Sequence, residues 1–404
     1  MSQVEILVVD GMSEDGTRQR VEDSARRFPL IRLIDNPRRI VPTALNLGIE
    51  AARGQWVIRL DAHSVYPPDY LRRCVETAQR TGADNVGGVC RTLPRDESTS
   101  ARLVQALSTS RFGVGGARFR VGGHEGQVDT VAFGCFRRRA FAEVGLFDER
   151  LARNQDYEFN RRLVAAGKHV WLDPAIQATY FNQATLSGLF GQASGTGKWN
   201  PWTWFVAPYA FAPRHAVPSL FVLGLLGAIG LTASFRWGWV ALAAILVPYT
   251  ALAVLASFQQ ARQFGLKLLP SLPLLFFAYH ASYGLGTLWG ALRLLVGATP
   301  VQKIREPWPG AGRYRAWPKP TGRPEARVWL SASCADCADS PPRSWTKSQV
   351  RIVRPQAQGR RTVCVLNLNL KPRRPTLSPL TLGLAGLECN EMNGRRPVST
   401  SRRS

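Results

Sequence analysis

The stretch VEILVVDGMSEDGT, residues 4–17, decides the fold. Residues 4–9 form an apolar run that predicts a strand buried on both faces, which is typical of a parallel sheet. The run leads directly into an acidic turn that begins at Asp10 and ends with a glycine, Gly16. A buried strand needs a neighbouring strand on each side, because its backbone N–H and C=O groups must be paired. The remaining sequence has to supply those neighbours.

Short apolar runs and amphipathic helices alternate over the first 200 residues. Helices are predicted over residues 42–53, 68–81 and 156–166, because the first two open with proline and all three stop at glycine. Strands and helices at this spacing predict an α/β domain with a mixed, mainly parallel sheet. Further strands are predicted over residues 30–34, 56–60, 86–89, 128–133 and 169–172.

The next region is dominated by long apolar segments. Residues 217–234 and 237–257 each approach the roughly 20 apolar residues that span a bilayer. Residues 269–292 form a third candidate, rich in Gly, Tyr and Trp. The preceding segment NPWTWFVAPYAFAPRH mixes aromatic residues with terminal basic ones, which is typical of a segment at the lipid headgroups. The alternative interpretation is a buried helical hairpin of a soluble domain.

The charge of the chain is concentrated at its end. Lys and Arg outnumber Asp and Glu by 52 to 28, a formal charge of +24. Residues 301–404 carry about 20 of the basic and about 6 of the acidic residues, which is more than half of the excess. Pro, Arg and Ser dominate there and no periodicity persists, so a disordered basic tail is predicted. Because the excess lies in this tail, its charge does not favour nucleic acid as a partner.

The cysteines do not form a recognisable framework. Cys74, Cys90 and Cys135 fall in apolar segments, which favours small buried side chains in a reducing compartment over disulfides. Cys334 and Cys337 form a lone CxxC, and the absence of a second nearby pair argues against zinc.

Three acidic sites stand at strand ends or helix starts. In an open parallel sheet ligands bind outside the carboxyl ends of the strands, so Asp10 and Asp61 are predicted to face one crevice. Asp61 and His63, two residues apart, are able to share a divalent ion. Asp156 either caps the helix that follows or acts as a general base at the crevice. Asp15 is interpreted as a turn or cap residue.

Three segments in order resemble one known family: VEILVVDGMSEDGT, DNPRRIVPTALNLGIEAARGQWVIRLDAHSVYPPDYL and VDTVAFGCFRRRAFAEVGLFDERLARNQDYEFNRRL. They are similar to family 2 glycosyltransferases, which have the Rossmann-like GT-A fold. The subgroup they resemble contains the membrane-bound enzymes that extend lipid-linked oligosaccharides in bacterial exopolysaccharide synthesis of the succinoglycan type. The resemblance covers residues 4–300.

The resemblance implies roles for the residues that match on the nucleotide side. Asp10 would contact the uracil or ribose of the nucleotide. Asp61 and His63 occupy the family's Asp-x-Asp position and would hold a divalent metal, Mg or Mn, on the diphosphate. Arg38, Arg39 and Arg59 would either add positive charge near the phosphates or remain solvated surface side chains.

On the acceptor side, the resemblance implies that Asp156 is the catalytic base. Lys198 and Trp199, downstream of Gln192, resemble a Gln…Arg-Trp element that closes the site over donor and acceptor. Gln155 stands where the family has Glu, and its lack of charge favours ionisation of Asp156. The family also begins with an earlier strand that carries Pro-x-x-Asn-Glu and lies beside residues 4–9. Without a counterpart of that strand, an unpaired strand edge is expected there.

Together these features predict inverting transfer of a sugar from a UDP-sugar, with glucose favoured, to a lipid-linked glycan. The alternative is a catalytically inactive glycosyltransferase fragment with a membrane anchor. A bacterial inner-membrane location with a cytoplasmic catalytic domain is expected. The predicted organisation is a glycosyltransferase domain without its first strand over residues 1–200, an interfacial segment with two or three transmembrane helices over 201–300, and the tail over 301–404.

Overall fold

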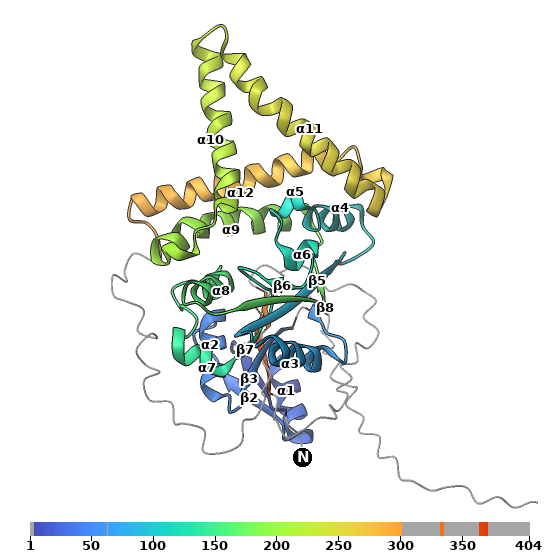
Figure 1. Ribbon diagram of the computed structural model, residues 1–404, viewed down its shortest axis with the longest axis vertical. Coiled ribbons are helices and arrows are strands. Elements are labelled where there is room, and N and C mark those ends of the chain that lie inside the picture. The colour runs from blue at the N-terminus through green and yellow to red at the C-terminus, as the bar shows by residue number, and fades with distance from the viewer. Residues whose placement is uncertain (1–3, 63, 301–331, 335–362, 371–404) are drawn as a thin grey trace, which may run out of the picture.

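The computed structural model describes residues 4–62 and 64–300, together with two strands at residues 332–334 and 363–370. A mixed α/β domain forms the body of the molecule, and a pair of long helices rises from one end of it (Figure 1). The predicted fold class is confirmed for the α/β domain.

Strand β1, Ile6–Asp10, is buried along its whole length. Successive side chains of a strand point to opposite faces of the sheet. Accordingly, Leu7 and Val9 belong to a core cluster with residues of helix α2, Val41–Ala51. Their neighbours Ile6 and Val8 belong to a second cluster on the other face, with residues of helices α1 (Thr17–Arg27) and α3 (Tyr70–Thr81). The prediction of a strand buried on both faces is thus confirmed.

The strands form one mixed sheet in the order β2-β1-β10-β3-β7-β5-β8-β4. The first four are parallel neighbours, whereas β7 runs antiparallel to both β3 and β5. The strands are β2 Ile31–Asp35, β3 Trp56–Asp61, β4 Ser64–Val65, β5 Asn85–Leu93, β6 Gly126–Gln127, β7 Cys135–Arg137, β8 Val170–Phe181, β9 Ala332–Cys334 and β10 Val363–Leu370.

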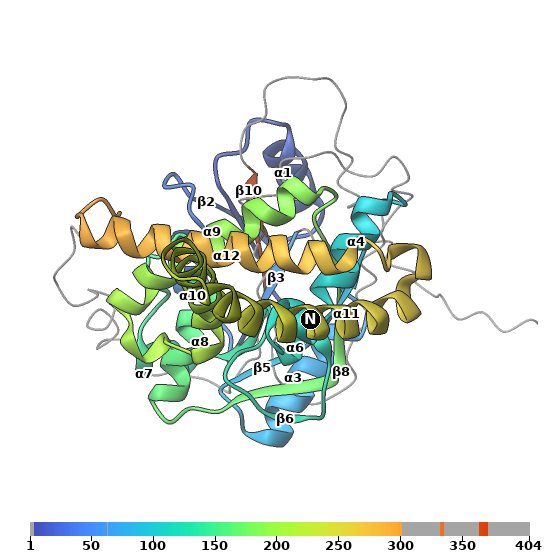
Figure 2. The same cartoon turned by 90° about the horizontal axis from the view of Figure 1, so that it is seen from above.

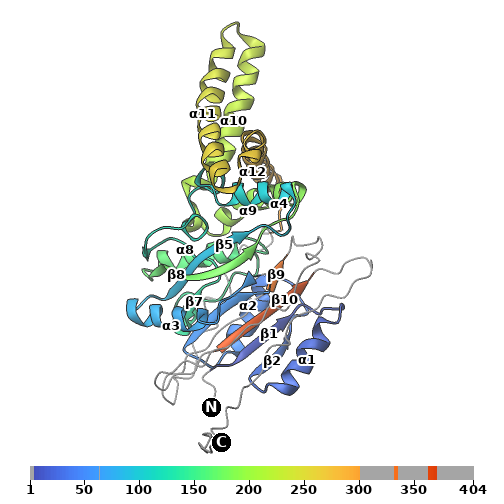
Figure 3. The same cartoon turned by 90° about the vertical axis from the view of Figure 1, so that its right-hand side faces the viewer.

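The second neighbour of β1 comes from the carboxyl-terminal part of the chain. Strand β10 lies between β1 and β3 and pairs in parallel with both (Figure 3). It occupies the side of β1 where an unpaired edge was expected. The prediction of an unstructured tail is therefore wrong for residues 332–334 and 363–370. The stretch VCVLNLNL contains no Pro or Gly, so its backbone can form hydrogen bonds with a strand on each side. The rest of the predicted tail lies outside the described residues.

One predicted strand does not form. Residues 128–133 separate β6 from β7 and belong to neither. Phe133 and Gly134 have φ angles of 62° and 89°, a left-handed conformation that interrupts a strand. In addition, the Asn160 side chain donates hydrogen bonds to Thr130 Oγ1 and to the Val131 carbonyl, at 3.0 and 3.1 Å. These bonds take the place of strand pairing.

The predicted helices of the α/β domain are confirmed to within about two residues, the usual uncertainty of helix ends. Cys74, Cys90 and Cys135 are free and buried, as expected. The helices are α1 Thr17–Arg27, α2 Val41–Ala51, α3 Tyr70–Thr81, α4 Thr99–Ser108, α5 Arg111–Val114, α6 Arg118–Val121, α7 Arg138–Val144 and α8 Gln155–Ala165.

Two further helices, α9 (Leu186–Val206) and α12 (Leu272–Leu295), lie side by side across the top of this domain (Figures 1 and 2). Their backbones touch at glycines. A Cβ atom on Gly197 would lie 2.2 Å from the Tyr283 carbonyl oxygen, and one on Gly286 would lie 2.3 Å from that of Ser194. The two helices therefore form one packed unit.

Helices α10 (Pro213–Ser234) and α11 (Gly238–Phe264) rise away from this unit. Within the described residues, these two helices are long and apolar enough to cross a membrane, by length and composition. Their apolar side chains face outward, with Leu226 55% and Val247 67% exposed. The third predicted span became α12, which lies along α9 and does not meet the same test.

The close approach of β5 and β8 gives a test of the fold. The pairing register shifts between Gly87 and Val89, and a Cβ on Gly88 would lie 1.9 Å from the Ile176 carbonyl oxygen. Gly88→Ala should therefore lower the free energy of unfolding by about 1–3 kcal/mol or more, because the sheet must open to fit the methyl group. Gly191→Ala is the control, since nothing lies within 4 Å of its added Cβ. Equal stability of the two variants in urea unfolding would contradict the close approach.

Candidate active site

Two buried aspartates lie at the carboxyl ends of two nearby strands of the sheet. Asp10 closes β1 and Asp61 closes β3, and strand β10 lies between them. Leu368 is opposite Asp10 in the pairing register, and Asn367 is opposite Asp61. Because neighbouring strands are about 4.8 Å apart, the two aspartate backbones lie roughly 10 Å from each other along the same edge. The carboxyl ends of β1 and β3 therefore bring these two predicted residues together.

The Asp10 carboxylate organises the turn that follows β1. It is fully buried and accepts hydrogen bonds from the backbone N–H of Ser13, at 3.0 Å, and from the Ser13 hydroxyl. Arg18 lies 3.8 Å from it and 2.7 Å from Asp35 at the end of β2. Asp15 accepts a hydrogen bond from the Thr17 N–H, as expected of a turn residue. A contact of Asp10 with a nucleotide stays a prediction.

The Asp61 carboxylate is held by an arginine of its own strand. Arg59 Nε lies 2.8 Å from one carboxylate oxygen, and a terminal guanidinium nitrogen lies 3.0 Å from the other. Residues two apart on a strand point to the same face, which allows this bidentate pair. Both side chains are almost completely buried. The Asp61 N–H also donates to the Tyr66 hydroxyl, at 2.7 Å.

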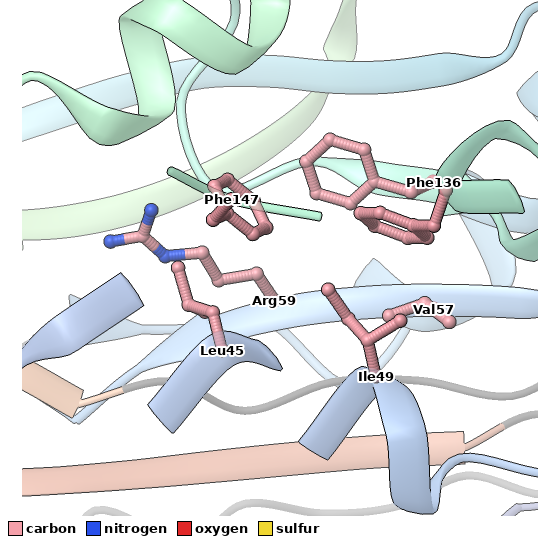
Figure 4. A pocket seen from close by; sticks show the side chains of 7 residues that line it. Leu45, Ile49, Val57, Arg59, Phe136 and Phe147 are labelled. Atoms are coloured by element: carbon pink, nitrogen blue, oxygen red, sulfur yellow. The ribbon is translucent and has the colours of Figure 1, made fainter. Parts of the chain in front are cut away.

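The Arg59 side chain runs through apolar surroundings before it reaches Asp61. Leu45, Ile49 and Val57 line a pocket with it, together with Phe136, Phe141 and Phe147. Figure 4 shows the guanidinium beside Leu45 and Phe147, on the side of the pocket away from Phe136. The apolar walls favour the ion pair, because an unpaired charge would be costly there.

The third predicted acid, Asp156, lies in the first turn of α8 and is exposed. Burial opposes the charge of Arg59, but the carboxylates of Asp61 and Asp156 outweigh it and raise the pKa of Arg59 above its ordinary value. Burial lowers the pKa of Arg153, and Tyr180 and then Asp156 partly offset that shift. Asp156 is thus within electrostatic reach of both arginines, and Arg59 interacts with both predicted functional acids.

The neighbouring acid Glu158 has a structural role. It is 1% exposed and makes a bidentate pair with Arg162, with distances of 2.9 and 2.6 Å. The Tyr209 hydroxyl donates to the same carboxylate. Arg162 also donates to the carbonyls of Val144 and Leu146. These bonds fix the body of α8 and leave Asp156 at its exposed start.

The residues before Asp156 are fastened to α9. Arg153 donates to the Gln192 carbonyl and to Thr196 Oγ1, at 3.4 and 3.3 Å. Asn154 donates to the Asn200 side chain, at 3.1 Å. The start of α8 is therefore held by the helix that packs along α12.

Lys198 and Trp199 also lie on α9, and both contact Trp202. The Lys198 Nζ atom stands 5.4 Å from the centre of the Trp202 ring, and the Trp199 ring meets it edge-on at 4.9 Å. Trp202 itself is buried and donates to the Gly290 carbonyl of α12. These contacts explain the local packing, whereas ligand binding by Lys198 and Trp199 stays a prediction.

The other two arginines predicted near the phosphates pair with glutamates. Arg38 pairs with Glu149, and Arg39 lies 3.5 Å from Glu14. His63 lies outside the described residues. Sequence reasoning missed Arg153, because its contacts on α9 lie about 40 residues away in the chain. The Arg59–Asp61 pair could have been found from its i, i+2 spacing on a predicted strand.

No group of three His, Cys, Asp or Glu side chains within the described part of the chain is placed to hold a metal ion. Asp61 is a suitable oxygen ligand at a strand end, and it is the described residue that best fits the predicted metal role. A metal on Asp61 would therefore need ligands from a bound diphosphate, from water or from residues outside the described ones.

Comparison with known proteins shows which family the amino-terminal residues resemble. Residues 1–145 match Glycosyl transferase family 2. The amino-terminal part of this chain is therefore similar to family 2 glycosyltransferases.

Particular relatives come from exopolysaccharide synthesis. Succinoglycan biosynthesis protein ExoA of Rhizobium meliloti is 34% identical over 195 residues, 48% of this chain and 58% of that protein. Succinoglycan biosynthesis protein ExoO of the same organism is 35% identical over 187 residues, 44% of this chain and 52% of that protein. The match thus spans less than two thirds of either relative. The chain is related to these two proteins, as the predicted subgroup requires.

The chain is also similar to one solved structure. It is the mannosyltransferase PcManGT from Pyrobaculum calidifontis in complex with GDP-Man and Mn2+. It is 19% identical with a TM-score of 0.42, and the match covers 70% of this chain and 78% of that one.

The buried pair on α8 gives a test of how the site is supported. Arg162→Met should lower the free energy of unfolding by about 3–5 kcal/mol, because Glu158 would be left buried without its counter-charge. The double variant Arg162→Met/Glu158→Gln should recover part of that loss. Urea unfolding of the full chain in detergent measures both. If the double variant were no more stable than Arg162→Met, charge pairing would not be what holds α8.

Proposed function

We propose that this chain transfers a sugar, with inversion, from a nucleotide-sugar donor to a lipid-linked oligosaccharide in bacterial exopolysaccharide synthesis. A UDP-sugar is the proposed donor, with glucose favoured. The observation that carries the proposal is the buried Arg59–Asp61 pair at the carboxyl end of β3, with Asp156 within its electrostatic reach, in a domain similar to family 2 glycosyltransferases. The relationship to two succinoglycan biosynthesis proteins supports the pathway.

Asp156 is proposed as the general base. Its carboxylate is exposed and stands in the first turn of α8, where an acceptor hydroxyl can reach it. In the reaction it would take the proton of the acceptor hydroxyl as that oxygen bonds to the sugar carbon. The bond from this carbon to the diphosphate oxygen breaks, and the diphosphate leaves with the electron pair. One base is sufficient for an inverting transfer, in contrast to the two carboxylates of glycoside hydrolases.

Asp61 is proposed to hold a divalent cation, Mg or Mn, together with the donor diphosphate, with His63 as a further ligand. When bound, such a cation neutralises charge on the departing diphosphate. Asp10, Lys198 and Trp199 are proposed to contact the nucleotide-sugar. The proposed domain division is catalysis by residues 1–200 and membrane attachment by residues 201–300.

Membrane attachment would bring the lipid-linked acceptor to the site. Helices α10 and α11 expose apolar side chains, and α9 joins the start of α8 to α12. The proposed base therefore lies on a segment anchored to the helical unit from which α10 and α11 rise. A cytoplasmic catalytic domain on the inner membrane is the proposed location.

Asp156→Asn tests the proposed base. Sugar transfer to a polyprenyl-diphosphate glycan should fall by about 10²- to 10⁴-fold, because the amide cannot accept the proton. UDP binding should stay unchanged, since this residue is not proposed to contact the nucleotide. Asp23→Asn on α1 is the control, because that carboxylate is exposed and pairs only with Arg26 in the described ion pairs. Full transfer by Asp156→Asn would refute the assignment, and UDP binding without transfer by the unmodified chain would favour the inactive alternative.

Leu223→Lys/Leu226→Lys tests the membrane attachment. Both side chains are about half exposed on α10. Each lysine should oppose insertion by about 2.5–3.5 kcal/mol near the bilayer centre, so the chain should be lost from membranes on carbonate extraction. Leu295→Lys at the end of α12 is the matched control and should be retained. Retention of the double variant would argue against α10 as a membrane span.

A further inference from the structure

Both carboxylate oxygens of Asp61 are already bound by Arg59. The two distances, 2.8 and 3.0 Å, describe a bidentate pair that uses the oxygen atoms a metal would need. The pair is nearly excluded from water, with side-chain exposures of 7% for each partner. A cation that binds Asp61 must therefore displace Arg59 from at least one carboxylate oxygen.

We propose that Arg59 competes with the divalent cation for Asp61, so that the cation binds appreciably only together with a nucleoside diphosphate. Arg59 is in this sense a positioning residue that makes metal binding depend on the donor. The inference rests on the proposed function, because it takes Asp61 as the metal ligand.

Charge balance supports this dependence. Arg59 and Arg153 carry two positive charges, which balance the two negative charges of Asp61 and Asp156. A divalent cation alone would place excess positive charge beside a buried guanidinium, which is unfavourable away from water. A diphosphate adds negative charge that compensates the metal.

The diphosphate would also give Arg59 an alternative partner. Guanidinium groups bind phosphate oxygens as readily as carboxylates, in the same bidentate manner. Once Arg59 pairs with phosphate, Asp61 is free to coordinate the cation without leaving any buried charge unpaired. Donor and metal would then bind with positive coupling.

The test measures binding of Mn2+ to the full chain in detergent, with and without UDP, by the loss of the free-ion signal in electron paramagnetic resonance. In the unmodified protein UDP should tighten Mn2+ binding by about 5- to 150-fold, the usual range of coupling between two ligands. Arg59→Gln should bind Mn2+ alone more tightly than the unmodified protein does, and UDP should add less. Equal Mn2+ affinity with and without UDP in the unmodified chain would overturn the proposal.

A matched control exists elsewhere in the chain. Arg150 and Asp148 also form a buried bidentate pair between residues two apart, with Nε 2.9 Å from one oxygen. Arg150→Gln should not gain Mn2+ affinity, and Arg59→Gln/Asp61→Asn should lose the gain of Arg59→Gln. An equal gain in Arg150→Gln would show that any uncovered carboxylate attracts Mn2+, and would also overturn the proposal.

Two further points keep the experiment decisive. Arg59→Lys keeps the charge and supports folding if Arg59→Gln does not fold, and it should give an intermediate Mn2+ affinity because lysine lacks the bidentate geometry. An affinity equal to that of the unmodified protein would count against the proposal. The experiment measures Mn2+ binding and not sugar transfer. A chain that shows this competition but lacks transferase activity would therefore contradict the proposed function and not this inference.

Discussion

The structure depends on the burial of β1 along both faces and both edges. Every backbone N–H and C=O of such a strand needs a partner, because water cannot reach it. Strand β2 supplies the partners on one side and β10 on the other. This requirement brings β3 within two strand spacings of β1 and aligns their carboxyl ends. The position of Asp10 relative to Asp61 is a consequence of that alignment.

Charge compensation is the second constraint, and it distinguishes the structural acids of the site from the proposed catalytic one. Asp10 is satisfied by Ser13 and lies near Arg18, whereas Glu158 is satisfied by Arg162 and Tyr209. Both hold the backbone in place. Asp156 stands outside these arrangements at an exposed helix start. An exposed carboxylate can be reached by an incoming hydroxyl, whereas a buried carboxylate with its hydrogen-bond partners already in place cannot.

Helix α9 connects the chemistry to the apolar helices. Its residues accept hydrogen bonds from Arg153 and Asn154, three and two positions before Asp156, and its glycines allow α12 to pack against it. A shift of α9 would therefore move the start of α8. This mechanical link is a reason to expect that binding of a lipid-linked acceptor near the helices influences the position of the proposed base.

The sequence by itself determined the local elements and the chemistry of single residues. The apolar run before Asp10, the helices between proline and glycine, and the two long apolar helices were all predicted, because periodicity and capping depend on neighbouring residues. Only the tertiary structure decided the rest. The pairing of β10 with β1, the loss of the strand expected over residues 128–133 and the attachment of Arg153 to α9 all depend on residues far apart in the chain. Such contacts are selected by the hydrogen-bonding groups that remain unpaired after local structure has formed, and no local pattern records them.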